Sequence, residues 1–333
     1  MENITTSFIN ANTIQLHYWF HDNSHTIDSF IQNKCEFEFL NVVKEIAKKF
    51  DTELVIETEP LAEGGLKRWY KLILKLENKN AIITTAVITA LATGVFVTPI
   101  TSSVSKITEK LIDNIFEDKE LKQLEQDKLR LEIEKLKLDT TLINKQLNEN
   151  TVIKKRRSNF YDALSKYPKI SKVSFVIEDD SKNKLSPESI VKKESFASYI
   201  LVTDDLEPER LENAIIDLIS PVLKKGNYKW RGFYDGVPIS FNMKSLEFKE
   251  LVQTGKVEFN NNSTIKCLLE IKKKINNEGI IEITNYNIIR VDEYYENSKT
   301  MKTNEGKLHQ KIKEAEKDIL FLPFDKDKNE KID

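Results

Sequence analysis

The sequence predicts an α+β protein built from five consecutive parts. Three observations lead to this. Segments with strand-like alternation mix with segments of helical spacing, one long stretch carries no charge in a chain that is 31% charged, and a charged stretch almost free of helix breakers follows it. The parts are a small N-terminal α/β module (1–80), a hydrophobic membrane segment (81–105), a long amphipathic or coiled-coil helix (106–153), a C-terminal α+β ligand-sensing domain (154–300), and a C-terminal helix with a latch strand (301–333).

Composition narrows the class of protein only in part. The chain has 333 residues and a net charge of -2, so its overall charge favours neither nucleic acid nor an anionic membrane surface. Cys35 and Cys267 are far apart and lie in apolar patterns, which gives no disulfide framework, no metal-ligand spacing, and a preference for a reducing compartment. The opening MENITTSFINANT lacks the pattern of a cleavable signal peptide.

The N-terminal module begins with a strand. Alternation predicts strands at Ile14–His21 and Glu53–Pro60, and apolar spacing predicts a helix at Cys35–Phe50. After a turn at Glu63–Gly65, the stretch Leu66–Lys79 is expected to lead helically into the charge-free segment.

The charge-free stretch AIITTAVITALATGVFVTPITSSVS runs from Ala81 to Ser105. A helix from Ala81 to Pro99 is about 27 Å long at about 1.5 Å per residue, close to the roughly 30 Å thickness of a hydrocarbon core. We therefore predict a membrane-spanning helix. The alternative is a buried helix in the core of a soluble domain. A re-entrant segment near Gly94 and Pro99, or insertion only after activation, also stays open.

Two stripes of small side chains run along this segment with a spacing of four residues. They consist of Thr85, Thr89 and Thr93, and of Ala86, Ala90 and Gly94. Small residues four apart let helices approach closely in lipid, so we expect this helix to assemble with copies of itself. The threonine hydroxyls then either line an aqueous path or bond to the backbone one turn back and only pack.

The stretch from Lys106 to about Asn150 predicts one long helix with two apolar stripes. Two stripes favour packing on more than one neighbour, as in a bundle or an oligomeric stalk. A single amphipathic helix that folds back on its own domain is the alternative.

The C-terminal domain is expected to alternate strands and helices. Strands are predicted at Lys172–Asp179, Ser198–Asp205, Lys229–Met243, Ser263–Ile271 and Gly279–Tyr295, and helices at Glu207–Lys225 and Ser245–Thr254. A basic joint, KKRR at Lys154–Arg157, introduces this domain.

Catalytic and metal motifs are missing from the sequence. It contains no glycine-rich phosphate loop, nucleophile elbow, HExxH or CxxC motif. His17, His21 and His25 run from a strand into a turn, where a spacing of four does not place them on one face, so polar edge and turn residues are favoured over a metal site. We expect a protein that is not an enzyme and has no cofactor and no metal.

Binding chemistry is concentrated in KKGNYKWRGFYDG, from Lys224 to Gly236. Proteins that bind single-stranded nucleic acid typically use cations to contact the phosphates and aromatic rings to stack on the bases. The predicted ligand residues are Lys224, Lys225, Lys229, Trp230, Arg231 and Tyr234, with Tyr228 and Phe233 in the same stretch. The alternative is that this tryptophan strand is core.

An apolar hexapeptide, ILFLPF at Ile319–Phe324, lies between charged segments of the tail. Because exposing its large side chains costs roughly 1.5–3 kcal/mol each, we predict a strand that inserts into a groove or sheet edge and acts as a latch. Its residues are Ile319, Leu320, Phe321, Leu322 and Phe324. A permanent final strand is the alternative.

The order of Ala81–Ser105, the helix after it and Ile319–Phe324 resembles the Hailong-type membrane effectors of bacterial nucleotidyltransferase-based anti-phage systems. The resemblance implies a tetrameric, self-inhibited ion channel in the bacterial inner membrane, with a cytoplasmic C-terminal domain. It also implies opening by a single-stranded DNA oligomer, or another nucleotide signal, made by a partner nucleotidyltransferase.

We accordingly expect a homo-oligomeric, ligand-gated membrane effector with the lipid bilayer as a partner. The alternative from another class is a non-enzymatic coiled-coil adaptor or scaffold whose apolar helix is buried. A pore-forming toxin without a gating ligand is a third reading.

Overall fold

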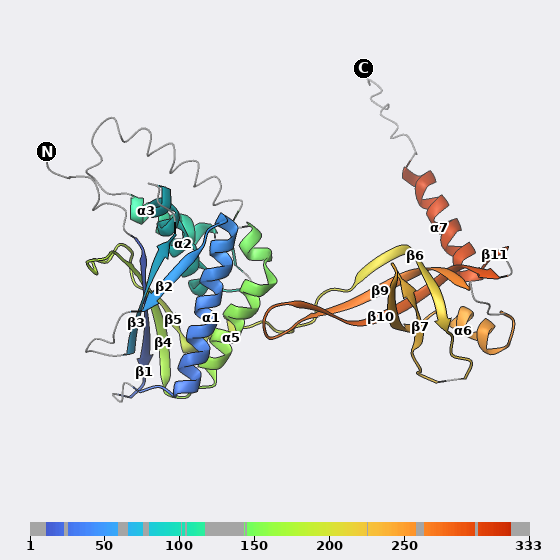
Figure 1. Ribbon diagram of the computed structural model, residues 1–333, viewed down its shortest axis with the longest axis horizontal. Helices are drawn as coiled ribbons and strands as arrows, with labels where there is room; N and C mark the ends of the chain where they lie inside the picture. The colour runs from blue at the N-terminus through green and yellow to red at the C-terminus, as the bar shows by residue number, and fades with distance from the viewer. Residues whose placement is uncertain are drawn as a thin grey trace, which may run out of the picture. The chain divides into compact units, whose positions relative to one another are not determined.

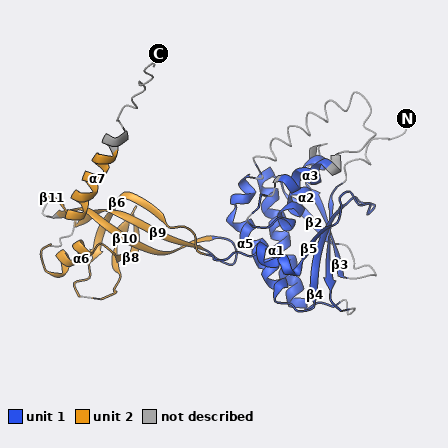
Figure 2. Cartoon of the chain, turned by 180° about the vertical axis from the view of Figure 1, so that it is seen from behind, with its two compact units in different colours: residues 1–204, 275–280 blue, residues 205–274, 281–333 orange. Residues whose placement is uncertain are grey.

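The computed structural model describes two compact units (Figure 2). Unit 1 comprises residues 1–204 and 275–280, and unit 2 comprises residues 205–274 and 281–333. Within them, the described residues are 11–22, 26–58, 66–75, 80–100, 102–103, 105–116, 143, 145–224, 226–257, 263–296 and 299–320. Each unit has a hydrophobic core of its own.

Unit 1 contains a five-stranded antiparallel sheet in the order β2-β3-β1-β4-β5. The strands are β1 (Thr13–Phe20), β2 (Leu54–Thr58), β3 (Leu66–Leu74), β4 (Ile170–Glu178) and β5 (Ser189–Lys192). With α1 between β1 and β2, and further helices between β3 and β4, the first four strands have the ferredoxin-like, split βαβ arrangement. The sequence predicted β1, β2 and β4 correctly, and β4 and β5 join this N-terminal sheet.

Helices cover one face of the sheet (Figure 1). They are α1 (Ser29–Ala47), α2 (Asn80–Val97) and α5 (Thr151–Ser165), and a short 3-10 turn, η1 (Lys48–Phe50), extends α1. Phe39 of α1, Phe96 of α2 and Phe160 of α5 all lie within 6.4 Å, centroid to centroid, of the Phe175 ring of β4. The core of unit 1 therefore forms where the three helices meet the central strands.

The prediction that 81–105 is a membrane segment is wrong. Among the described residues, no helix combines the length and the apolarity that crossing a bilayer requires. α2 instead packs between the sheet, α1 and α3 (Ser105–Phe116), and Ala86, Ala90 and Leu91 are each 0% exposed. A helix that is apolar on every side is either in lipid or fully buried, and here the protein core surrounds it.

The threonine and small-residue stripes of α2 are buried in unit 1. The Thr85 hydroxyl donates to the Ala81 carbonyl at 2.7 Å, and the Thr89 hydroxyl donates to the Thr85 carbonyl at 2.8 Å. These are the bonds to the preceding turn that a threonine makes when it packs inside a helix bundle.

Buried polar side chains cap the C-terminal end of α2. Arg157 donates to the carbonyls of Val95 and Thr98, and the hydroxyls of Tyr161 and Tyr199 donate to those of Phe96 and Val97. The last carbonyls of a helix lack partners within the helix and carry partial negative charge. Burial lowers the pKa of Arg157 to about 10, and the guanidinium stabilises this helix end in the core.

The predicted long helix over 106–153 is also wrong as a continuous stalk. α3 ends at Phe116, and residues 117–142 lie outside the described residues. Asn150 has extended backbone angles, and its side chain accepts from the Ile153 backbone N–H, which caps the start of α5. α5 then enters the core of unit 1, with Phe160 and Tyr161 each 0% exposed.

Unit 2 is built on a six-stranded sheet in the order β11-β10-β8-β7-β6-β9, in which β9 also pairs with β10. The strands are β6 (Glu209–Ser220), β7 (Trp230–Tyr234), β8 (Val237–Met243), β9 (Thr264–Ile275), β10 (Ile281–Glu296) and β11 (Lys299–Lys302), with α6 (Leu246–Gln253) and α7 (Asn304–Leu320). The β9–β10 pairing closes β6 to β10 into a five-stranded barrel. A parallel β8–β10 pair and a helix between the third and fourth strands give the topology of an OB-type barrel.

Three predicted elements have a different structure. Leu66–Lys79 and Glu207–Lys225 were expected to be helical, but they contain β3 and β6. The expected strand Ser198–Asp205 begins in the last two residues of the 3-10 helix η2 (Lys193–Tyr199) and is otherwise largely irregular. In β6, Ala214 and Ile216 are buried and their neighbours are exposed, which is a period of two. Pairing with β7 and β9 on both sides decides in favour of a strand.

The tail helix is confirmed as α7, but the latch prediction is only partly covered by the structure. Ile319 and Leu320 are the last residues of α7 and are helical, so the expected strand does not begin at Ile319. Phe321, Leu322 and Phe324 lie outside the described residues.

Candidate nucleic-acid interface

β7 divides the predicted ligand residues between the inside and the outside of the barrel. Trp230 is 1% exposed and packs against Phe241 and Phe248 in the unit 2 core. Arg231 and Phe233 face outward, and Phe233 is 41% exposed. Successive side chains of a strand point to opposite faces. The assignment of Trp230 as a ligand residue is therefore corrected to core, while Arg231 remains a surface cation.

Gly232, between these two outward residues, allows β7 to lie close to β6. A Cβ atom at this position would lie 2.6 Å from the Asp217 carbonyl oxygen and 2.8 Å from the Ile216 side chain. Glycine in a strand interior often marks such a close backbone approach. Its presence keeps Arg231 and Phe233 adjacent on the outer surface of the closed barrel.

The loop before β7 supplies two further cations and an aromatic ring. Lys224 and Lys229 are exposed, and Tyr228 is 62% exposed. α6 holds this loop, because the Gln253 side chain donates to the Lys224 carbonyl at 3.1 Å and the Lys249 ammonium donates to the Gly226 carbonyl at 3.1 Å. Lys225 lies outside the described residues.

Exposed apolar side chains of the neighbouring strand β6 continue this surface. Ile215 and Ile219 of β6 are 57% and 47% exposed. We call the set Lys224, Tyr228, Lys229, Arg231, Phe233, Ile215 and Ile219 the barrel face. Clustered exposed apolar residues on a folded protein often mark a binding surface.

The barrel face combines positive charge with aromatic rings. Lys224, Lys229 and Arg231 can pair with phosphates, and the exposed rings of Tyr228 and Phe233 can stack on bases. One carboxylate, Asp217, is paired opposite Phe233, and it accepts a hydrogen bond from the Thr264 hydroxyl at 2.8 Å.

Tyr234, the last predicted ligand residue, lies at the rim of the barrel. Its side chain is partly buried against the unit 2 core. Burial, together with the nearby carboxylates of Asp235 and Glu209, raises the pKa of Tyr234. Tyr234 therefore contributes packing at the rim of the core rather than a fully exposed ring on the barrel face.

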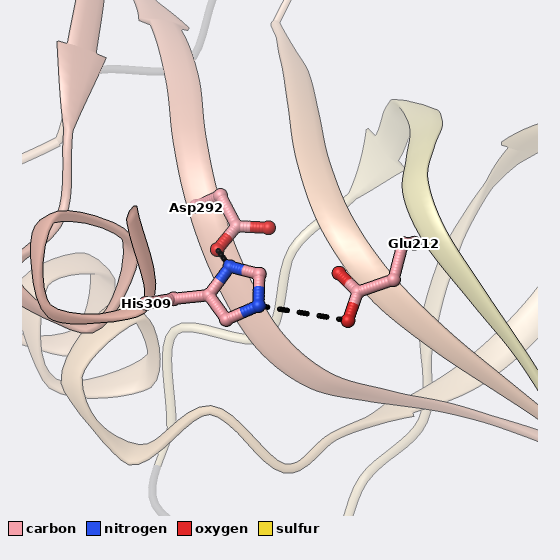
Figure 3. Close-up of side chains that lie close together, drawn as sticks. All are labelled: Glu212, Asp292 and His309. Carbon is pink, nitrogen blue, oxygen red and sulfur yellow. Dashed lines mark ion pairs between the residues drawn. The ribbon is translucent and has the colours of Figure 1, made fainter. Parts of the chain in front are cut away.

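A second polar cluster in unit 2 could in principle hold a metal ion. Glu212 of β6, Asp292 of β10 and His309 of α7 converge, with one ligand atom of each within 4.8 Å of the others (Figure 3). His309 Nε2 lies 3.7 Å from a Glu212 oxygen, and His309 Nδ1 lies 3.9 Å from an Asp292 oxygen.

Arg290 already supplies a cation to this cluster. Its guanidinium contacts Asp292 at 2.6 Å and Glu212 at 2.7 Å. Burial opposes its charge, but the hydrogen bond and charge of Asp292, with those of Glu212, raise the pKa of Arg290. Arg290 of β10 is therefore ion-paired with both carboxylates, Glu212 of β6 and Asp292 of β10, and His309 of α7 lies beside them.

Comparison with known proteins gives no relative for this chain. No protein-family model matches it, and neither a curated protein nor a solved structure matches it. Any function must therefore be argued from the residues themselves.

Sequence reasoning found the cations and rings of the loop and of β7 but missed the apolar part of the barrel face. Ile215 and Ile219 were hidden because Glu207–Lys225 was interpreted as a helix. The sequence carries no signal that separates them, because Ile215 and Ile219 are as apolar as Ile216 and Leu218. Only the structure shows that Ala214, Ile216 and Leu218 face inward.

Proposed function

We propose that this protein binds single-stranded nucleic acid on the barrel face of unit 2. The observation that carries the proposal is the outward pair Arg231 and Phe233 on β7, next to a loop that exposes Lys224, Tyr228 and Lys229. Each base has a face that stacks on an aromatic ring, and each phosphate has a charge that pairs with a cation.

The position of these residues in the barrel supports the proposal. OB-type barrels bind oligonucleotides or oligosaccharides on the face of their second and third strands and on the loop between the first and second strands. In this chain those elements are β7, β8 and the loop before β7. Fold alone does not imply function, but three cations beside two exposed rings favour a strand that carries phosphates over an uncharged sugar chain.

The structure removes the basis for the predicted membrane pore but not the basis for the predicted ligand. The pore was predicted from Ala81–Ser105, and α2 lies in the core of unit 1. The prediction of a single-stranded oligonucleotide rests on other residues and does not need a membrane segment. We therefore propose only the binding function.

The test is the affinity of the full chain for a fluorescent single strand of about 12 nucleotides, within the roughly 4–16 nucleotides that one such barrel covers. Fluorescence anisotropy should show binding that weakens as salt rises from about 50 to 200 mM. Because stacking contributes about 1–3 kcal/mol per base, Phe233→Ala should weaken binding by roughly 5- to 150-fold.

The matched control is Tyr295→Ala. Tyr295 is an aromatic residue of β10, 37% exposed, outside the barrel face, and its removal should leave the affinity within about twofold. If the wild-type chain does not bind the strand, or if the two variants weaken binding equally, the proposal fails.

A further inference from the structure

The sheet of unit 1 has a second face that no described helix covers (Figure 1). Ile14, Leu16 and Tyr18 of β1 point into the helical core, so Gln15, His17 and Trp19 point to the opposite side. The cross-strand register places Trp69 of β3 beside Gln15, and Ser174 of β4 beside His17. Gln15, His17 and Ser174 are only 8%, 6% and 1% exposed, so the centre of this side is buried even though no described helix covers it. We call this side the open sheet face.

Two tryptophans are held on the open sheet face in defined orientations. The Trp19 indole N–H donates to the Ser174 hydroxyl at 2.9 Å, and the Trp69 indole N–H donates to Glu178 at 2.9 Å. Gln15 donates to the other oxygen of Glu178 at 2.9 Å. These hydrogen bonds fix the orientation of both indole rings. The rings therefore lose little conformational entropy when a flat partner stacks on them.

The anchoring carboxylate is itself buried. Glu178 is 2% exposed, and its burial raises the pKa of this carboxyl, against the opposing effects of the Trp69 hydrogen bond and of nearby lysines. Its two oxygens are occupied by the hydrogen bonds from Trp69 and Gln15, and because the carboxyl is buried it adds little negative charge to the surface.

A lysine covers each tryptophan ring. The Lys172 ammonium lies 4.2 Å from the Trp19 ring centroid, and the Lys182 ammonium lies 4.5 Å from that of Trp69. Trp69 is only 5% exposed under this cover. Lys182 is exposed in a turn with a φ of 63°, so its side chain has room to move away. A cation over a ring occupies the place where a base would stack.

The charges of the open sheet face complement a phosphate backbone. Its lysines are Lys67, Lys71, Lys172, Lys182, Lys184 and Lys192, and its carboxylates are Glu57, Glu178 and Asp180. Glu178 is buried, and Asp180 is already bound by Lys71 at 2.6 Å and by the Asn12 amide at 3.0 Å. Among the residues that the structure describes, the accessible charge on this face is therefore mainly positive.

We propose that the open sheet face is a second binding surface for single-stranded nucleic acid, exposed when phosphates draw Lys172 and Lys182 off the rings of Trp19 and Trp69. This inference rests on the proposed function of the barrel face and deepens it. Two surfaces in one chain raise the effective concentration of the second contact, so a strand long enough to reach both binds more tightly than a short one.

The experiment measures the affinity of the full chain for single strands of about 12 and about 30 nucleotides. In the variant Lys172→Glu with Lys182→Glu, binding of the long strand should weaken by at least about tenfold, while binding of the short strand at the barrel face changes by less than about twofold. Phe233→Ala should weaken binding of both strands. Lys106→Glu with Lys110→Glu, which reverses two exposed lysines of α3, is the matched charge control.

A second variant guards against misfolding. Lys184→Glu with Lys192→Glu changes two exposed lysines that cover neither ring, and it should also weaken binding of the long strand selectively. Binding should in addition change the fluorescence of the wild-type chain, because Trp19 and Trp69 lie on this face.

The outcomes separate the two proposals. If the short strand binds and depends on Phe233, but neither pair of lysine variants affects the long strand, the second surface is refuted and the barrel face stands. If the wild-type chain binds neither strand, the proposed function is refuted together with this inference.

Discussion

Two stretches of the sequence stand out, and the structure gives them opposite environments. The apolar stretch around α2 was expected to face lipid, yet Thr89, Ala90 and Thr93 are 0% exposed inside unit 1. The stretch around β7 contains a tryptophan, Trp230, that is buried in the core of unit 2, yet it places Arg231 and Phe233 on the surface. The apolar character of a stretch therefore does not show which of its side chains can contact a partner. In a strand such as β7, alternate side chains are exposed, whereas nearly all of α2 is buried.

The largest effect we expect comes from the inward side of β7. Trp230→Ala should reduce the free energy of unfolding of unit 2 by about 3–5 kcal/mol, because it removes a fully buried aromatic ring. Phe233→Ala, two residues away, should change stability by about 0.5 kcal/mol or less, as is usual for a surface substitution. Urea unfolding followed by circular dichroism measures both, and equal losses would contradict the alternation of β7.

The next effect concerns the buried end of α2. Arg157→Leu should reduce the free energy of unfolding of unit 1 by about 2–4 kcal/mol, since the carbonyls of Val95 and Thr98 lose a buried donor. The exposed Arg210, whose side chain is 67% exposed, provides the control Arg210→Leu, which should cost about 0.5 kcal/mol or less.

Each unit contains one buried cysteine that reports on its own unfolding. Burial raises the pKa of Cys267 to about 12 and raises that of Cys35 still further from its ordinary value, so both thiols stay protonated and unreactive near pH 8 in the folded chain. Arg157→Leu should accelerate labelling of Cys35 by a thiol reagent and leave Cys267 in unit 2 unchanged. Equal acceleration at both thiols would contradict a local role for Arg157 in unit 1.

A smaller effect distinguishes two threonines of α2. The buried Thr93 hydroxyl has no hydrogen-bond partner among the residues that the structure describes, so Thr93→Val should raise the free energy of unfolding by about 1 kcal/mol. Thr89→Val should change it by about 0.5 kcal/mol or less, because the Thr85 carbonyl that its hydroxyl bonds also takes part in the helix ladder. Thermal unfolding tests the pair, and a marked loss in Thr93→Val would show that its hydroxyl has a partner.

The smallest effect is electrostatic. Lys224→Ala or Lys229→Ala should each lower the slope of log affinity against log salt by about 0.7 for a single strand, if each lysine neutralises one phosphate. Lys311→Ala, an exposed lysine of α7, should leave the slope unchanged. A slope that is the same in all three variants would remove the loop lysines from the interface.

The sequence predicted elements correctly where a single period was present. β1, α1, β4, α6 and α7 each show one pattern. The strand predicted at Lys229–Met243 is instead divided into β7 and β8 by a turn at Asp235-Gly236, where both residues have positive φ. β3 and β6 were misread because their apolar residues fit both periods, and only pairing with neighbouring strands decides between them.

The candidate site was predictable in its chemistry but not in its geometry. The cations and rings of Lys224–Tyr234 are visible in the sequence, whereas the inward position of Trp230 depends on the closure of the barrel. The open sheet face could not be inferred, because Trp19 and Trp69 are 50 residues apart in the sequence and come to lie on one face only through the pairing of β1 with β3.

The most direct test of the barrel face is photochemical cross-linking of the full chain to a single strand that carries 5-iodouracil, followed by mass spectrometry of the linked peptides. Tyr228 and Phe233 offer exposed rings for this reaction. We predict that the peptide containing Tyr228 and Phe233 is linked, and that linkage there is lost in Tyr228→Ala with Phe233→Ala. Cross-links confined to other peptides, with none between Lys224 and Tyr234, would contradict the assignment of the barrel face as the nucleic-acid interface.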